Sequence, residues 1–303
     1  KQRNSNNFNP INFINSSSDN EDQIKFGFIL DNQNLSIQKF NHKRNYNFSY
    51  LSSNNPLLNN NKGGLGFSSK VRIGNDELIF GFQDSSLKSS INEEFDENIK
   101  AQTISASYSY SNSFLDDLTL LSGLVIEKGS ILDSKGSGAF SLNESNSRSY
   151  LGGINVKKNI SNDTSINFSS VLARTSFENL DNNLISSFNP ISSSSFDFYL
   201  EKNNLFFDDD IFSFTISQPH RIESGEMRIM IPNLADKYGN LTYRYSEIDL
   251  NPNGRQIDIG IGYSRKINDN FLFNIKSVHI KDRNHNSRKE IDHLALFNAL
   301  YKF

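Results

Sequence analysis

The stretch of sequence that decides the fold is Arg255–Lys266, which reads RQIDIGIGYSRK. From Ile257 to Tyr263 every second residue is apolar, whereas the residues between them are Asp or Gly and the next one is Ser264. Because successive side chains of a β-strand point to opposite faces of a sheet, this alternation predicts a strand with one apolar face and one small, polar face.

Outward from this stretch, the same alternation recurs at residues 194–203, 225–232 and 240–248, and helical periodicity is nearly absent. Taken with the other apolar runs, the pattern predicts twelve strands, with boundaries good to a few residues. Their ranges are 76–83, 99–110, 114–127, 148–158, 163–174, 194–203, 210–218, 225–232, 240–248, 255–266, 270–281 and 291–303.

The connections between these strands largely alternate in length. The first, third and fifth (residues 84–98, 128–147 and 175–193) are long and rich in Ser and Asn, whereas the second, fourth and tenth (111–113, 159–162 and 267–269) are short. Such alternation is expected when one rim of a barrel faces the medium and the other faces the periplasm. The seventh and ninth connections do not fit, because they should lie on the outer rim and yet are short.

Composition agrees with a barrel. The chain of 303 residues is only 36% hydrophobic, with a mean hydropathy of −0.54, yet aromatic residues make up 12% of it. A chain that is polar on average but rich in Phe and Tyr suits a barrel in which only the outward positions are apolar. No stretch approaches the eighteen apolar residues of a membrane-spanning helix. We therefore predict an all-β fold, a transmembrane antiparallel up-and-down β-barrel of about twelve strands over residues 76–303, in a bacterial outer membrane.

The first 75 residues fit this pattern less well. Gln23–Leu30, Leu35–Phe40, Asn45–Leu51 and Gly63–Ile73 have strand character. They could be extra barrel strands, giving fourteen or sixteen, or the end of an upstream domain. Residues 1–22 and 52–62 are rich in Asn and Ser and are expected to be linkers. Since the chain starts at Lys1 without Met or a signal peptide, we expect it to be part of a longer protein.

The last predicted strand ends in an aromatic column. Phe297, Ala299, Tyr301 and Phe303 alternate and so share one face. This column resembles the signal that ends outer-membrane barrels and that the barrel-assembly machinery recognises, which implies an aromatic girdle at the periplasmic interface. The alternative is an ordinary edge strand.

Three segments resemble a known family. They are SQPHRIESG at residues 217–225, LNPNGRQID at 250–258 and DRNH at 282–285. In this order and spacing they are similar to segments of the C-terminal translocator barrels of subtilisin-like autotransporters, especially those of alphaproteobacteria. The chain departs from that pattern with His220 for Leu, Gln256 for Glu and Asn284 for Gly.

The resemblance covers about the last ninety residues well. It implies a twelve-stranded barrel that anchors and exports an N-terminal passenger by type V secretion. The catalytic residues of such a passenger are absent from this chain, so its protease activity is not carried over. The expected partners are outer-membrane lipid, the barrel-assembly machinery and the chain's own passenger.

Charged residues in and near these segments are candidates for a salt-bridge network in the lumen, with solvated rim charges as the alternative. They are Arg221, Glu223, Arg244, Arg255 and Asp258.

Little in the sequence suggests catalysis or a cofactor. The net charge of −3 favours no nucleic-acid partner, and the chain has no Cys. None of the five His has the His-Glu-x-x-His spacing of a metal site or a His close to it in the sequence. The Gly-rich pieces at 63–66 and 136–138 lack the Lys-Ser/Thr of a phosphate loop. We therefore expect neither cofactor nor metal, and no enzymatic activity in the barrel itself.

Two alternatives to a translocator remain open. One is a free-standing outer-membrane barrel, either a channel for small solutes or a phospholipase. His285-Asn286-Ser287 loosely resembles the His-x-Ser of outer-membrane phospholipases, but it lies in a polar loop and lacks the Asn-Gly that follows in that family. The other is a soluble β-sandwich adhesin, which the terminal aromatic and the unequal connections disfavour.

Overall fold

The computed structural model describes residues 24–29, 36–37, 56–59, 65–74, 76–85, 100–134, 136, 138–142, 145–178, 184–235, 237–239, 241–268, 270–287 and 291–301. These residues form an all-β fold made of one large sheet and one small sheet. In the described part of the chain, no helix has the length and apolar character needed to cross a membrane.

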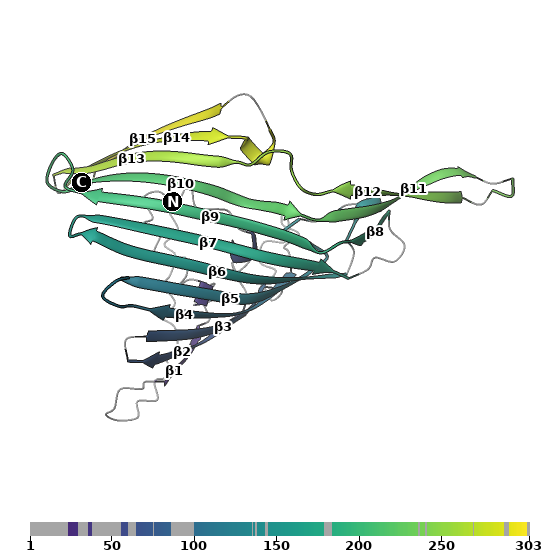
Figure 1. Ribbon diagram of the computed structural model, residues 1–303, viewed down its shortest axis with the longest axis horizontal. Helices are drawn as coiled ribbons and strands as arrows, with labels where there is room; N and C mark the ends of the chain where they lie inside the picture. The colour runs from purple at the N-terminus through teal and green to yellow at the C-terminus, as the bar shows by residue number, and fades with distance from the viewer. Residues whose placement is uncertain are drawn as a thin grey trace.

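The main sheet has twelve strands, and every neighbouring pair is antiparallel. The strands follow one another across the sheet in the order of the chain, in an up-and-down arrangement (Figure 1). In order across the sheet they are β1 (Ile24–Ile29), β2 (Leu65–Ile73), β3 (Asp76–Asp84), β4 (Lys100–Tyr110), β5 (Asp117–Lys128), β6 (Asn146–Ser161), β7 (Thr164–Phe177), β9 (Ile191–Asn203), β10 (Asp210–Ser224), β13 (Ile257–Asn268), β14 (Phe271–Lys281) and β15 (Ile291–Tyr301).

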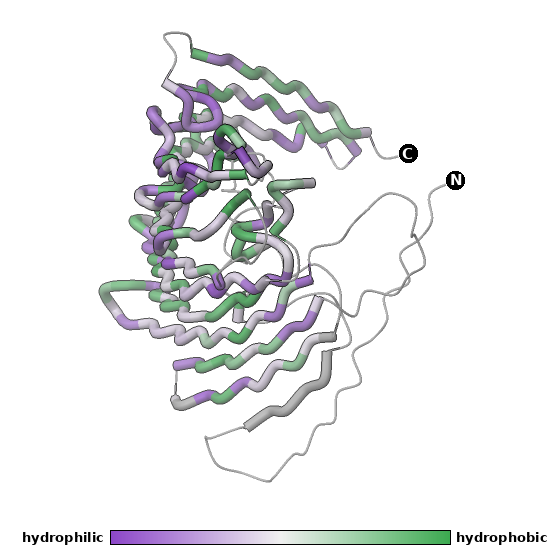
Figure 2. The backbone as a smooth tube through the Cα atoms, turned by 90° about the vertical axis from the view of Figure 1, so that its right-hand side faces the viewer, coloured by the Kyte–Doolittle hydropathy of each residue, from purple (hydrophilic) through white to green (hydrophobic). Residues whose placement is uncertain are grey.

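The main sheet curls, so that it has an inward face inside the curl and an outward face (Figure 2). Within the described residues, β1 pairs only with β2 and β15 pairs only with β14, so the sheet is an open trough and not a closed barrel. The predicted antiparallel up-and-down sheet is thus confirmed, but in this structure the sheet is not closed into a barrel.

Three shorter strands form the small sheet, in the order β12 (Leu241–Asp249), β11 (Glu226–Ala235) and β8 (Ile185–Phe188). The β11–β12 hairpin extends beyond one end of the main sheet (Figure 1). The prediction that residues 225–232 and 240–248 are barrel strands is therefore wrong, because β10 pairs directly with β13. Residues 225–256 form one long connection that contains the hairpin, which removes both exceptions to the alternation of connection lengths.

Two strands before residue 76 lie in the main sheet instead. β1 and β2 correspond to the segments 23–30 and 63–73, which have strand character in the sequence. Ser36 and Ile37, in the segment 35–40, are helical and not in a strand, and α2 (Pro56–Asn59) lies in the expected linker 52–62. Residues 1–22 and 45–51 are outside the described residues.

Gly225 allows the chain to leave β10 for β11. Its φ of +156° is a backbone conformation that other residues rarely adopt, and a Cβ there would lie 2.9 Å from Cγ1 of Ile191. Glycine is therefore required at this exit from the main sheet.

On several strands, the two faces of the main sheet have the reverse of the polarity expected of a sheet in water. On β4 the outward Ile104 is 55% exposed and Tyr108 is 36% exposed, whereas the inward Thr103 is 1% exposed. Its other inward residues are also small and buried: Ala101, Ser105, Ser107 and Ser109. The same alternation holds on β13, where Ile259 and Ile261 are exposed and Gly260 and Gly262 are buried. Apolar residues outside and small polar residues inside are the pattern of an outer-membrane barrel.

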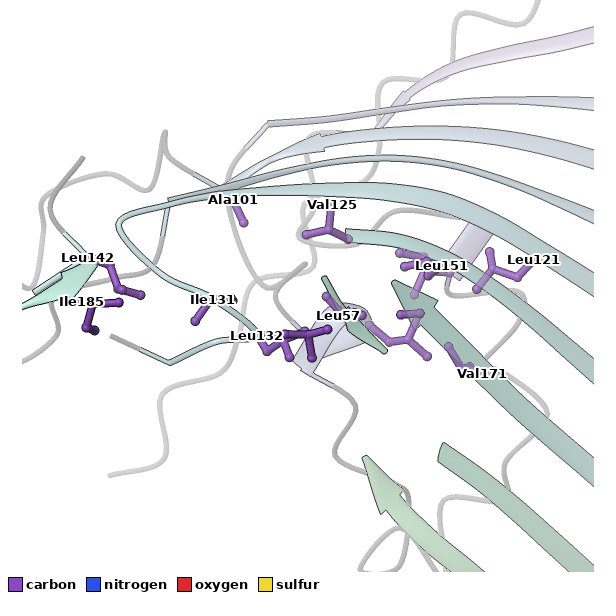
Figure 3. Packing of buried hydrophobic residues seen from close by; sticks show 14 residues of the cluster. Leu57, Ala101, Leu121, Val125, Ile131, Leu132, Leu142, Leu151, Val171 and Ile185 are labelled. Atoms are coloured by element: carbon purple, nitrogen blue, oxygen red, sulfur yellow. The ribbon is translucent and has the colours of Figure 1, made fainter. Parts of the chain in front are cut away.

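A cluster of buried apolar residues lies inside the curl, toward the end where the long connections are (Figure 3). Leu121, Val125 and Leu151 of the inward face pack there against Leu57 of α2, which is fully buried. Ser36 lies near the same face, since its hydroxyl forms a 2.5 Å hydrogen bond with the hydroxyl of Ser105. Parts of the segment between β1 and β2 therefore fold into the trough.

Candidate functional site

The three segments that resemble the translocator family meet at one end of the main sheet. Residues 217–225 end β10, residues 250–258 lead into β13, and residues 282–285 follow β14 and include the 3-10 turn η4 (Arg283–His285). Register brings these ends together, because Ser217 lies opposite Asp258 and Ile257 lies opposite Lys281. We call the side chains gathered here the rim cluster; they are Ser194, Gln218, Arg221, Glu223, Arg255, Gln256, Asp258 and His285.

Arg221 is the buried centre of the rim cluster. It is 8% exposed, and its Nε donates to the carbonyl of Gly254 at 3.1 Å while its Nη2 donates to the carbonyl of Pro252 at 2.9 Å. Its Nη1 forms an ion pair with Glu223. A buried guanidinium is tolerated only when its donors are used, and here they hold the chain just before β13.

Glu223 joins the two arginines of the cluster. Nη1 and Nη2 of Arg255 donate to its two carboxylate oxygens at 2.9 and 2.7 Å, a bidentate pair. The hydroxyl of Ser194 on β9 donates to the same carboxylate at 2.6 Å, and Arg255 also donates to Gln218. Because the side chain of Arg255 is half exposed, solvent weakens the attraction between the two charges. The pair therefore contributes mainly by fixing the positions of Arg255 and Glu223 relative to each other.

His285 connects η4 to the other two segments. The backbone N–H of Gln256 donates to its Nδ1 at 3.0 Å, so Nε2 carries the proton and donates to the carbonyl of His220 at 2.9 Å. Partial burial is the largest cause that lowers the pKa of His285 below 6.5, and the positive charges of Arg221 and Arg255 lower it further. The ring is thus held neutral with both nitrogens engaged.

Of the three positions at which the chain departs from the family pattern, Gln256 and Asn284 contact each other and His220 contacts His285. The side-chain oxygen of Gln256 accepts the backbone N–H of Asn284 at 2.7 Å, and His220 accepts from His285. Asn284 has a φ of +57°, in the left-handed region that glycine adopts freely and that Asn tolerates better than most residues. An Asn where the family has Gly is therefore compatible with the same turn.

Gly254 is required by a close approach of two loops. Its N–H donates to the carbonyl of His285 at 2.8 Å, and a Cβ at this position would lie 2.5 Å from the backbone nitrogen of Ser287. Only glycine fits there without moving one of the loops.

The structure brings together most of the charged residues selected from the sequence. Arg221, Glu223 and Arg255 form direct contacts, whereas Asp258 pairs with Gln256, whose Nε2 donates to it at 2.8 Å. Arg244 does not belong to this group, because it lies exposed on β12 opposite Ile231. The sequence analysis missed Ser194, Gln218 and His285 as partners; the last two lie in the family-like segments, which was the available signal.

The C-terminal column lies on the outward face of β15. Phe297, Ala299 and Tyr301 share this face, and the ring of Phe297 contacts the ring of Phe273 edge to face at 5.2 Å. Phe303 lies outside the described residues.

The outward face as a whole is the largest candidate interaction surface. Exposed aromatic and aliphatic side chains occur on eight of its strands, from β3 to β15. They include Phe80, Ile104, Tyr108, Leu120, Tyr150, Ile154, Phe168, Leu172, Ile259, Ile261, Ile275, Phe297 and Tyr301. Soluble monomers rarely expose a continuous apolar surface of this kind, which marks a site of contact with membrane or protein.

Among the described residues, no three or more His, Asp or Glu side chains gather closely enough to hold a metal ion. Two histidine contacts nevertheless form between residues distant in the sequence: His285 contacts the backbone carbonyl of His220, and the side chains of His279 and His293 contact each other.

The chain matches no model of a known protein family, no curated protein and no solved structure.

Proposed function

We propose that the chain is a bacterial outer-membrane β-barrel that acts as the translocator of an autotransporter, anchoring and exporting a passenger domain that precedes it. The observation that carries the proposal is the polarity of the main sheet, whose outward face exposes large apolar side chains while its inward face carries many small polar residues beside one buried apolar cluster. Such a sheet is stable where its outward face meets hydrocarbon, and it would expose a large apolar surface to water elsewhere.

A membrane environment would also require the sheet to close into a barrel. In hydrocarbon, an unpaired strand edge costs several kcal/mol per unsatisfied backbone group, so only closed sheets span a membrane. We therefore propose that β1 and β15 pair in the membrane. The even number of strands supports this, because the first and last strands of an even up-and-down sheet run antiparallel.

The connections support a barrel with two unequal rims. Residues 74–75, 111–116, 162–163, 204–209 and 269–270 are short turns at one end of the sheet. Residues 30–64, 85–99, 129–145, 178–190, 225–256 and 282–290 are long connections at the other. With the β11–β12 hairpin assigned to a single connection the alternation has no exception, and we assign the short rim to the periplasm.

The role as translocator rests on the segments at the long rim. The family resemblance concerns residues 217–225, 250–258 and 282–285, and these are the segments that interlock in the rim cluster. Their hydrogen bonds join backbone to side chain across the end of β10 and two connections, as expected of residues that shape the rim of a barrel. The polar inward face would accommodate the polypeptide that links barrel and passenger.

The geometry of His285 weighs against a phospholipase. A general base needs a free nitrogen within hydrogen-bond reach of the nucleophile. Both nitrogens of His285 are engaged by backbone groups of Gln256 and His220, and the Ser287 backbone N–H donates to the Asn253 side chain at 2.9 Å. We expect wild-type protein and the Ser287→Ala variant to be equally inactive toward phospholipid. Hydrolysis that Ser287→Ala abolishes would favour the phospholipase instead.

The test of the translocator is export of an unrelated passenger. A folding-competent reporter fused ahead of Lys1 should reach the cell surface, where added protease degrades it in intact cells. The matched control is the same fusion carrying Ile261→Arg, which should reduce insertion of the barrel and leave more of the reporter protected. A reporter that stays protected although the wild-type barrel has inserted would refute the translocator and favour a free-standing channel.

A further inference from the structure

A pair of histidines lies on the outward face of the last two strands. His279 on β14 and His293 on β15 are directly opposite in the register of the sheet. Their Nδ1 atoms lie 2.6 Å apart, and the two rings are edge to face with centroids 4.6 Å apart and an interplanar angle of 88°. Both side chains are exposed. Fourteen positions separate the two residues in the sequence, so only the β14–β15 hairpin creates the pair.

The two Nδ1 atoms face the same point in the space between the two rings. With neutral rings, one nitrogen must donate a proton to the lone pair of the other. A metal ion in place of that proton would bind both lone pairs. Metal–nitrogen bonds of about 2.0–2.1 Å place two cis ligands roughly 2.9–3.4 Å apart, so the nitrogens must separate by less than about 1 Å. Rotation of exposed side chains about χ1 and χ2 provides such a movement without any change in the backbone.

We propose that His279 and His293 form a two-histidine site for one divalent first-row transition-metal ion, which clips β15 to β14. Imidazole suits Cu²⁺, Ni²⁺ and Zn²⁺, and the general order of affinity places Cu²⁺ first. The register of the hairpin fixes the two Cβ atoms about 4.5–5.5 Å apart in the absence of metal, so the site needs little ordering when the ion binds.

The surroundings of the pair define the rest of the coordination. Next to the pair on the same face lie Ser277 and Lys281 on β14 and Ile291 and Ala295 on β15, and none of these four is acidic. The protein therefore supplies two neutral nitrogen donors, and the remaining positions are left to water or an external ligand. Such a site is open and exchangeable, and the positive charge of Lys281 weakens it.

Binding should stabilise the end of the sheet. An ion that binds the paired strands and not the unfolded chain shifts the folding equilibrium toward the folded state. The clip reinforces the pairing of β15 with β14, which is the strand pairing of β15 that the described residues show. This inference concerns two residues outside the rim cluster and does not depend on the function proposed above.

The test is a titration of the full chain, folded in detergent, free of any affinity tag and stripped with a chelator. CuCl2 is added in a calorimeter, and the visible and electron paramagnetic resonance spectra of the bound copper are recorded. We expect one equivalent to bind with the spectral signature of two nitrogen ligands, and ZnCl2 to compete for the same site. His279→Asn and His293→Asn should each weaken binding at least about tenfold, whereas Lys281→Gln should retain or strengthen it.

Folding is checked separately, because both histidines are exposed and their variants should migrate like wild type on an unheated gel. Loss of copper binding in a histidine variant that migrates as wild type supports the site. Absence of stoichiometric binding to the wild-type chain, or an affinity that changes less than about fivefold in the double variant, would overturn it.

Discussion

Replacing Ile261 by Arg distinguishes a membrane sheet from a water-exposed one. Ile261 lies near the middle of β13 on the outward face and is 46% exposed. If this face meets water, a surface substitution of this kind changes stability within about 0.5 kcal/mol. If it meets the centre of a bilayer, the same substitution costs about 2–4 kcal/mol. At about 1.4 kcal/mol per factor of ten, the membrane interpretation predicts a loss of roughly 30- to 1000-fold in the folding equilibrium.

The assay is folding into phospholipid vesicles over a urea gradient, followed by the faster migration of folded barrel on unheated gels. Ile160→Arg is the control, since Ile160 lies in the register shift at the short-turn end of β6 and is 62% exposed. Near the interface the same substitution should cost about 0–1 kcal/mol. If Ile261→Arg and Ile160→Arg fold equally well, or if the wild-type chain stays folded and monomeric in buffer without lipid, the outward face does not contact a bilayer.

Three further outcomes follow from the structure. Gly254→Ala should lower the urea midpoint by creating a 2.5 Å clash with the Ser287 backbone, whereas Gly152→Ala, with open space around its Cβ, should not have this steric effect. Because burial lowers the pKa of His285, the unfolded chain binds the proton first, so stability should fall as pH drops below 6.5 and then level off; His285→Asn should flatten this change in a urea titration across pH. Tyr301→Ser should reduce insertion more than the same change at Tyr238 in the hairpin, measured as surface protein; equal insertion would contradict an assembly role for the aromatic column.

The faces of the strands could be predicted from the sequence. The alternation of Ile259, Gly260 and Ile261 fixes which side chains share a face, because the period of two is a property of the extended backbone. The partners of the strands could not be predicted in the same way. Residues 225–232 and 240–248 alternate as regularly as the strands of the main sheet, and yet they pair with each other in a separate sheet. Only the two short connections around them indicated that they do not belong to the main sheet.

The rim cluster was predictable only in part, for a related reason. Arg221, Glu223 and Arg255 are charged residues in segments selected for their resemblance, so grouping them needed no structure. Arg244 was grouped with them because its strand was assigned to the wrong sheet. The contacts of His285 run to backbone atoms of Gln256 and His220, and such contacts depend on the path of two loops and leave no residue pattern in the sequence.

The cluster has a structural task that accounts for the residues found there. β10 continues beside β9 up to Ser224, while its pairing with β13 ends at Ser217. In this last part the register shifts twice, and Pro219 has no N–H to donate to a neighbouring strand. The carbonyls of Pro252 and Gly254 accept hydrogen bonds from Arg221 in place of a strand partner. Arg221 therefore connects the end of β10 to the segment just before β13. This is the place where the chain leaves the main sheet toward the β11–β12 hairpin and returns to it. A buried arginine, its glutamate and a glycine at the contact between loops are what this exit requires.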